Sequence, residues 1–227
     1  MRTVISRRSV GGRFVTAAVT GLVFLVATGC GGGGDDAPKE PEPVAGTQLC
    51  GGHALSADAS RALKVITGES RFEPSGEEYT LARAAADLSD AYLNPRVYRG
   101  DACRIYTPPG TPDFELRITW RWVDGAPTDD LASKFTVLKM GELALAAADS
   151  ANVQFGCRTD KFAGTATAAH ILIDVARGGM PKPPEGDVEA LKDAYATVAH
   201  SYSLAMAKEL GCQKNGGLPD KVVLDPA

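Results

Sequence analysis

The chain has 227 residues, of which 44% are hydrophobic and 23% are charged. This composition supplies one compact core and excludes a polytopic membrane protein, a collagen-like chain and a disordered chain. The formal net charge of −4 argues against a nucleic-acid-binding protein held by a broad basic surface. Five cysteines are an odd number for so short a chain, so we expect one of them to have a separate role.

Residues 1–29 have the features of a signal peptide. Four arginines and no acidic residue accompany an apolar run from Phe14 to Ala27. The run has about 14 residues, fewer than the roughly 20 of a spanning helix, which favours an export signal over a permanent transmembrane anchor. Residues 6–10 resemble a twin-arginine motif, but Gly11 and Gly12 replace the apolar residues expected next, so the export route stays open between twin-arginine and Sec.

The signal ends at a candidate lipidation site. Small residues precede Cys30, and the segment 26–30 resembles the bacterial lipobox, with Ala27 where Leu is usual. The resemblance implies that Cys30 carries a diacylglycerol and anchors the mature protein to the extracytoplasmic face of the cell membrane. The alternative is a soluble secreted protein with a cysteine near its cleavage site.

Removal of residues 1–29 leaves 198 residues with a net charge of −8, because four arginines and no acids are lost. An acidic surface disfavours binding to anionic headgroups, so the lipid on Cys30 is the expected membrane contact. Residues 31–47 are rich in Gly, Pro and acidic side chains. They predict a flexible tether, within the segment 30–47, that reaches roughly 20–25 Å and precedes a single globular domain over 48–227.

The four remaining cysteines are Cys50, Cys103, Cys157 and Cys212. An even number in a chain addressed to an oxidising compartment predicts two disulfide bonds. No pair has Cys-x-x-Cys spacing and the three histidines are scattered, so we expect neither a zinc site nor a thioredoxin-like redox centre. We predict no metal and no other cofactor.

Helical periodicity predicts three helices. Ser56 caps a first helix that runs to Thr67 and ends at Gly68. Residues 75–78 form a capping box for a second helix that ends at Asn94. The third helix spans 187–210. Its apolar stripe consists of Val188, Leu191, Tyr195, Val198, Tyr202, Ala205 and Met206.

Period-two alternation predicts the strands. The clearest strand spans 114–122 and forms a hairpin with a shorter strand at 103–107, and further strands are expected around 134–139, 142–148, 152–158 and 168–177. The fold class is therefore α+β, an antiparallel sheet of about six strands with three helices packed on one face and two disulfides.

The directions of these elements select among the three possible disulfide pairings. The first helix runs up, the second runs down and the next strand runs up, which places Cys50 and Cys103 at the same end. The same reasoning over the later strands and the last helix places Cys157 beside Cys212. Each bond closes a loop of about 55 residues, worth about 4 kcal/mol in the chain-entropy model.

The sequence contains no nucleophile elbow, phosphate-binding glycine loop or His-Glu-x-x-His motif, and we predict no catalytic residue. His200 falls opposite the apolar stripe of the last helix and is predicted to be solvated. His170 and Asp174 share a strand face, but four strand residues span about 13 Å, too far for a direct hydrogen bond. His53, in a glycine-rich loop beside Cys50, is a possible binding residue or simply a polar loop residue.

Aromatic and cationic residues alternate on the clearest strand. Trp120 and Trp122 continue its apolar face, so we expect them in the core, with an aromatic platform for a sugar or peptide as the alternative. The opposite face carries Arg117 and Arg121, with Arg104 nearby. This row is either a binding site for an anion or a partner, or an ordinary solvated sheet face.

The chain as a whole resembles the uncharacterised secreted lipoproteins of actinobacteria, in its lipobox, its acidic tether and the cysteine segments at 49–52, 103–105, 155–157 and 210–212. The resemblance implies a cell-envelope address and carries over no catalytic residue. Two hypotheses follow. The first is a non-catalytic envelope module that binds a small ligand or an envelope protein. The second is an envelope hydrolase with an unrecognised site at His53 or on the strand of His170.

A deep pocket that combines His53 with acids or a serine would favour the hydrolase, whereas a surface with exposed aromatic or arginine side chains would favour the binding module.

Overall fold

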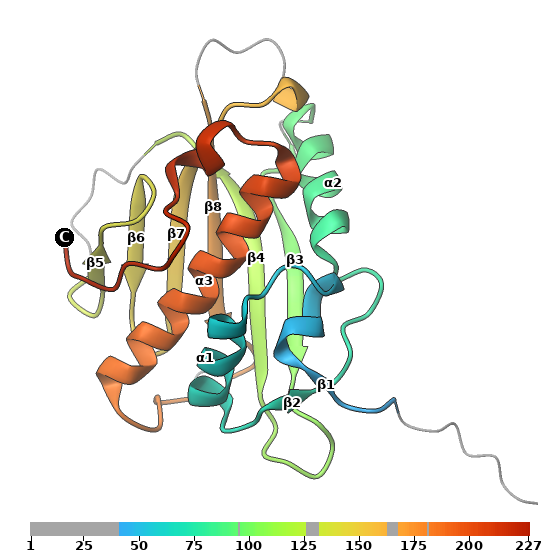
Figure 1. The fold of residues 1–227 in the computed structure, drawn as a ribbon, viewed down its shortest axis with the longest axis vertical. Coiled ribbons are helices and arrows are strands. Elements are labelled where there is room, and N and C mark those ends of the chain that lie inside the picture. The colour runs from blue at the N-terminus through green and yellow to red at the C-terminus, as the bar shows by residue number, and fades with distance from the viewer. Residues whose placement is uncertain (1–40, 95, 126–131, 163–167, 181) are drawn as a thin grey trace, which may run out of the picture. The chain divides into compact units, whose positions relative to one another are not determined.

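A computed structural model describes residues 41–94, 96–125, 132–162, 168–180 and 182–227 (Figure 1). The predicted signal peptide, the lipidation of Cys30 and all but the last residues of the tether lie outside these ranges. The described chain begins near a two-stranded sheet in which β1 (Val44–Ala45) pairs with β2 (Arg71–Phe72).

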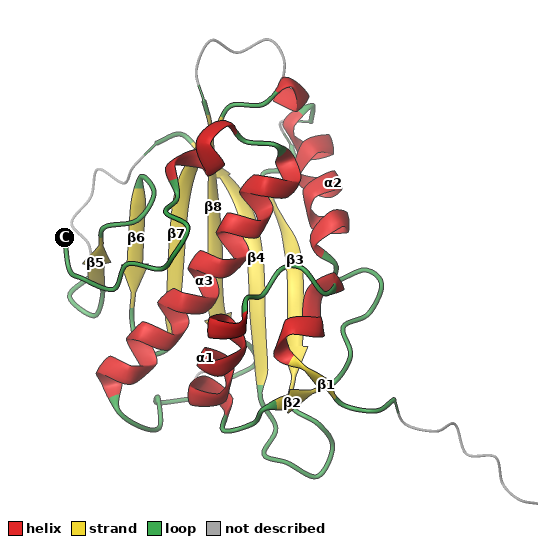
Figure 2. Ribbon diagram, viewed as in Figure 1, coloured by secondary structure: helices red, strands yellow, loops and turns green. Residues whose placement is uncertain are grey.

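The main sheet is antiparallel, with the strand order β3-β4-β8-β7-β6-β5. Figures 1 and 2 show the three longer helices on the same side of this sheet. The α+β prediction, with six antiparallel strands and three helices on one face, is confirmed. The strands are β3 (Arg99–Tyr106), β4 (Glu115–Val123), β5 (Thr136–Leu138), β6 (Leu143–Ala146), β7 (Ser150–Cys157) and β8 (Ala169–Arg177). The longer helices are α1 (Ala57–Thr67), α2 (Leu81–Tyr92) and α3 (Val188–Leu210), and the 3₁₀ helices are η1 (Gly46–Gly51), η2 (Asp160–Phe162) and η3 (Gln213–Gly217).

Alternation along each strand separates a buried face from an open one. On β4, Leu116, Ile118 and Trp120 point toward the helices and are at most 1% exposed. On β8, Val175 and Ile173 lie opposite Ile118 and Trp120, and Ile171 lies opposite Trp122, so these three residues face the same side. The intervening residues of β4 and β8 lie on the opposite face, which no described helix covers.

The capping predicted for the first helix is confirmed. The Ser56 side chain accepts the Ala59 N–H at the start of α1, and Gly68 ends that helix in a left-handed conformation. The predicted start of the second helix is wrong. Thr80, rather than Ser75, caps α2, and the Ser75 hydroxyl instead accepts the N–H of Cys50 at 3.0 Å. The predicted cap, Ser75, is therefore engaged by Cys50, which lies 25 residues earlier in the sequence, and does not cap α2.

The predicted environment of His200 on α3 is also wrong. His200 is only 4% exposed, and its Nε2 donates to the Pro219 carbonyl at 2.8 Å. The chain after Gly211 returns beside α3 and packs on the sheet (Figure 1), with Leu218 buried and Gly216 against Phe155 of β7, and this return brings Pro219 to His200. Val188, assigned to the apolar stripe, is 50% exposed because it is the first residue of the helix.

Both predicted disulfides are confirmed. Cys50 of η1 pairs with Cys103 of β3, with a Cα–Cα distance of 5.6 Å. Cys157, the last residue of β7, pairs with Cys212, which follows α3, at 4.9 Å. Both distances suit a disulfide. One bond ties the N-terminal segment to the edge strand of the sheet, and the other ties the C-terminus of α3 to the sheet.

Candidate functional site

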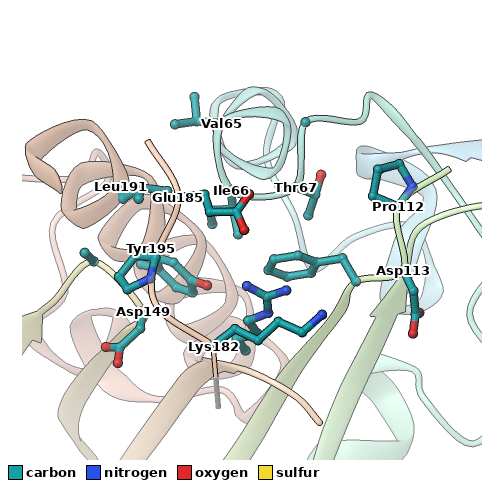
Figure 3. A pocket seen from close by; sticks show the side chains of 15 residues that line it. Val65, Ile66, Thr67, Pro112, Asp113, Asp149, Lys182, Glu185, Leu191 and Tyr195 are labelled. Carbon is teal, nitrogen blue, oxygen red and sulfur yellow. The ribbon is translucent and has the colours of Figure 1, made fainter. Parts of the chain in front are cut away.

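A pocket opens where α1, the β3–β4 turn, the β6–β7 turn, the end of β8 and the start of α3 meet (Figure 3). We call it the basal pocket. Its volume is about 440 Å³, within the range of roughly 300–1,000 Å³ typical of small-molecule sites. It is lined by Val65, Ile66, Thr67, Gly68, Pro112, Asp113, Phe114, Ala148, Asp149, Arg177, Lys182, Pro184, Glu185, Leu191 and Tyr195.

Tyr195 contributes an unused hydroxyl to this pocket. The residue is 2% exposed, and Figure 3 shows its hydroxyl directed into the hollow. The hydroxyl makes no hydrogen bond to any described residue, although buried tyrosines normally find a partner. Burial raises the pKa of Tyr195 to about 12, against the opposing effect of the positive charge of Arg177. At neutral pH the phenol is therefore a hydrogen-bond donor.

Arg177 contributes an unpaired cation beside Tyr195. It is the last residue of β8, where the Gly178 N–H continues the ladder by donating to the Glu115 carbonyl at 2.8 Å. Its guanidinium Cζ lies 4.5 Å from the centre of the Phe114 ring. No ion pair joins Arg177 to any described acidic residue. Stacking on Phe114 holds the guanidinium in place and leaves its N–H donors free for a ligand.

The acidic side chains that line the pocket differ in whether they already have a partner within the protein. Asp149 forms an ion pair with Lys134 at 3.1 Å and accepts a hydrogen bond from Ser150. Its pKa is lowered, because these interactions outweigh the effect of burial. Asp113 and Glu185 are exposed at the rim. The lining also holds two cations: the partly buried Arg177 guanidinium in the inner pocket and the exposed Lys182 ammonium group.

Apolar side chains form the remaining inner surface. Ile66 and Leu191 are 8% and 4% exposed, and they line the hollow from α1 and α3. The exposed Val65 extends this surface toward solvent. An apolar wall beside an unpaired guanidinium and a phenol donor is complementary to an organic anion with an apolar body.

The basal pocket was not predicted from the sequence, although one signal for it exists. Residues 171, 173 and 175 of β8 are apolar and face the helices, and Arg177 continues that register. A cation at an inward position at the end of a strand breaks the apolar pattern. Such a break indicates that the apolar core ends at this position and that a binding pocket can begin there.

The predicted arginine row is brought together with acidic residues. Arg104 lies opposite Arg117 in the β3–β4 register. Arg117 donates to both carboxylate oxygens of Glu115, at 2.6 and 3.2 Å, and Arg104 donates to Asp101 at 2.7 Å. Glu115 has a lowered pKa, chiefly because of the hydrogen bond from Arg117. Arg121 is exposed on the same open face, farther along β4.

The histidine candidates lie apart from the basal pocket. His53 is exposed in the turn after η1. The partner of His170 is Glu142, whose Oε2 lies 2.7 Å from Nδ1, and Glu142 also accepts a hydrogen bond from Gln154. Glu142 was not predicted as a partner of His170; it precedes β6 and reaches His170 across Gly156 of the intervening strand β7. Asp174 does not take part in this contact.

The two tryptophans lie on the predicted face. Trp120 is 1% exposed in the core, and Trp122 is partly buried within an aromatic cluster with Tyr92 and Phe162.

Among the described residues, no group of three His, Cys, Asp or Glu side chains is arranged to hold a metal ion.

Comparisons of the chain with family models, curated proteins and solved structures find no match. Within the described ranges, no helix combines the length and apolar character needed to cross a membrane.

Proposed function

We propose that this protein is a lipid-anchored, extracytoplasmic binding module of the cell envelope, and that its basal pocket binds a small organic anion with an apolar body. The observation that carries the ligand class is the pairing of an unpartnered phenol, Tyr195, with an unpaired guanidinium, Arg177, in one pocket. Both groups are hydrogen-bond donors, and the buried walls beside them are apolar.

The anchoring part of the proposal rests on the sequence. The segment ending at Cys30 resembles a lipobox, and the resemblance to secreted lipoproteins of actinobacteria gives the same address. The described chain enters the domain at β1, whose Ala45 pairs with Arg71 of β2. Arg71 follows soon after Thr67 and Gly68, which line the basal pocket. The proposed tether therefore leads into β1, which pairs with a strand only a few residues after these two lining residues in the sequence.

The ligand class can be tested with 4-ethylbenzoate and its neutral match, 4-ethylbenzamide. We expect the full-length protein in neutral detergent to bind the carboxylate in isothermal titration calorimetry and to bind the amide much more weakly. Arg177→Met should weaken carboxylate binding about 10- to 100-fold, since a hydrogen bond to a charged group contributes about 1.5–3 kcal/mol.

Arg117→Met is the matched control, because it makes the same substitution in the arginine row on the open face. The proposal requires that Arg117→Met leaves the affinity unchanged. Equal binding of the amide and the carboxylate would show that the pocket does not select an anion. Loss of binding in Arg117→Met alone would move the site to the arginine row.

Lipid anchoring has an independent test. Cys30→Ala removes the only acceptor for the lipid in the lipobox-like segment, and we expect the variant to leave the detergent phase after phase partitioning. Cys157→Ala is a control that removes a cysteine but keeps the lipobox. A Cys30→Ala variant that stays in the detergent phase would refute the anchor.

A further inference from the structure

A second pocket lies at the opposite end of the sheet from the basal pocket. It opens beside the end of β4 and the start of β8, whereas the basal pocket opens beside the start of β4 and the end of β8. We call it the aromatic pocket, and its volume is about 490 Å³. It is lined by Ala91, Tyr92, Val97, Tyr98, Trp122, Val123, Asp124, Ala168, Ala169 and His170.

Three aromatic side chains from different segments line this pocket: Tyr92, Tyr98 and Trp122. Tyr92 ends α2 and Trp122 lies near the end of β4; their ring centres are 5.5 Å apart and the rings are tilted by 56°. Phe162 packs against both rings from the core side. The backbone of Tyr98 is held nearby, because the backbone N–H of Trp122 donates to the Tyr98 carbonyl at 2.8 Å. Inclined aromatic faces of this kind form the walls of sites for organic cations.

The rim of the aromatic pocket is unusually apolar for a solvent-exposed surface. Leu93, Val97 and Tyr98 are 81%, 42% and 57% exposed, and they follow one another closely in the α2–β3 connection. Clustered exposed apolar side chains mark interaction sites, whereas single ones need no explanation. The exposed face of Tyr98 already attracts one cation, since the Arg99 guanidinium carbon lies 5.7 Å from the ring centre.

The charged groups that line the pocket favour a positive ligand. Asp124 is exposed at the mouth, immediately after β4, and no ion pair joins it to a described residue. His170 forms the other edge, and its Nδ1 is held by the Glu142 carboxylate. Among the residues that the structure describes, no Lys or Arg lines this pocket. The aromatic faces and the carboxylate of Asp124 all attract positive charge, in contrast to the donors of the basal pocket.

We propose that the aromatic pocket is a second, independent ligand site, which binds an organic ammonium ion between Tyr92, Trp122 and Tyr98, with Asp124 as its counter-ion. The ligand class is opposite in charge to that of the basal pocket. The two sites lie at opposite ends of β4 and β8, so either proposal stands if the other fails.

Choline and its neutral isostere 3,3-dimethylbutan-1-ol test this site directly. The chain has two tryptophans, and one of them, Trp122, lines the pocket, so tryptophan fluorescence of the full-length protein in neutral detergent reports binding. We expect saturable quenching by choline and at least tenfold weaker binding of the neutral alcohol. Equal binding of the two compounds, or no saturable binding of choline, would overturn the proposal.

Two surface variants locate the binding without disturbing the core. Tyr98→Ala and Asp124→Asn change exposed side chains, and each should weaken choline binding at least fivefold. Asp225→Asn is the matched control, because Asp225 is exposed beside Pro226, which bridges to β5 at the far edge of the sheet. Unchanged choline affinity in both pocket variants, or an equal loss in Asp225→Asn, would overturn the proposal.

Discussion

Tyr195→Phe separates the stability of the domain from binding at the basal pocket. The substitution keeps the ring, which packs in the core, and removes a hydroxyl that has no described hydrogen-bond partner. Since no partner is left unsatisfied, we expect the free energy of unfolding to stay within about 0.5 kcal/mol of the unchanged protein or to rise. Affinity for 4-ethylbenzoate should nevertheless fall.

The expected loss of affinity follows from the chemistry of the contact. A phenol that donates to a carboxylate makes a charge-assisted hydrogen bond, which contributes about 1.5–3 kcal/mol. Tyr195→Phe should therefore raise the dissociation constant of the carboxylate about 10- to 100-fold. The affinity for the neutral amide should change much less, because the hydrogen bond that it loses involves no charged group.

Tyr202→Phe is the matched control on the same helix. The Tyr202 hydroxyl donates to the Ala102 carbonyl at 3.2 Å, and both residues are fully buried. Removing this hydroxyl leaves the carbonyl unpaired, which costs about 1–3 kcal/mol. Urea denaturation measures both variants. A Tyr195→Phe variant destabilised as much as Tyr202→Phe, or one with unchanged carboxylate affinity, would refute a ligand-binding role for the Tyr195 hydroxyl.

Three further predictions concern the fold around the two sites. Replacing Cys157 and Cys212 by Ala opens a loop of 55 residues, so the free energy of unfolding should fall by about 4 kcal/mol in the chain-entropy model. Urea titrations measure this loss, and a loss below about 1 kcal/mol would contradict the loop-entropy argument. Burial lowers the pKa of His200 from its ordinary value of 6.5, so the unfolded chain binds more protons and stability should fall as the pH drops below about 6.5. His200→Gln should flatten this fall between pH 7.5 and pH 5, and an unchanged pH profile would exclude His200 as its source. Gly156→Ala would place a Cβ 2.6 Å from Glu142 Oε1 and should displace the Glu142 carboxylate from His170. The ¹⁵N chemical shifts of the His170 ring would detect this loss of contact. Unchanged shifts in a folded variant would show that the Glu142 side chain moves aside and keeps its contact with His170.

The sheet and the disulfides could be predicted because they depend on patterns that the sequence carries locally. The alternation on β4 places Leu116, Ile118 and Trp120 on one face, and a register shift of one residue would turn all three to the open face. The directions of successive elements then bring Cys50 beside Cys103, and Cys157 beside Cys212, without any knowledge of side-chain packing.

The parts that were missed depend on contacts between distant segments. His200 lies on the polar side of the α3 periodicity, but the chain around Pro219 returns to cover it, and periodicity carries no information about that return. The capping box at Ser75 is locally plausible, yet the Ser75 hydroxyl is used by Cys50, 25 residues away in sequence. A local rule fails where a tertiary partner competes for the same polar group.

The two pockets share a structural origin, which explains why neither was predicted. Each is built around an inward-facing strand position at the end of the sheet: Arg177 is the last residue of β8, and Trp122 is the penultimate residue of β4. Inward positions in the middle of these strands, such as Ile173 and Trp120, are covered by the helices and can only pack. At the strand ends the same register emerges at the pocket walls, where an unpaired guanidinium or an aromatic ring is accessible to a ligand. In a half-covered sheet of this kind, chemically distinctive residues at inward-facing strand ends are therefore the first places to look for binding sites.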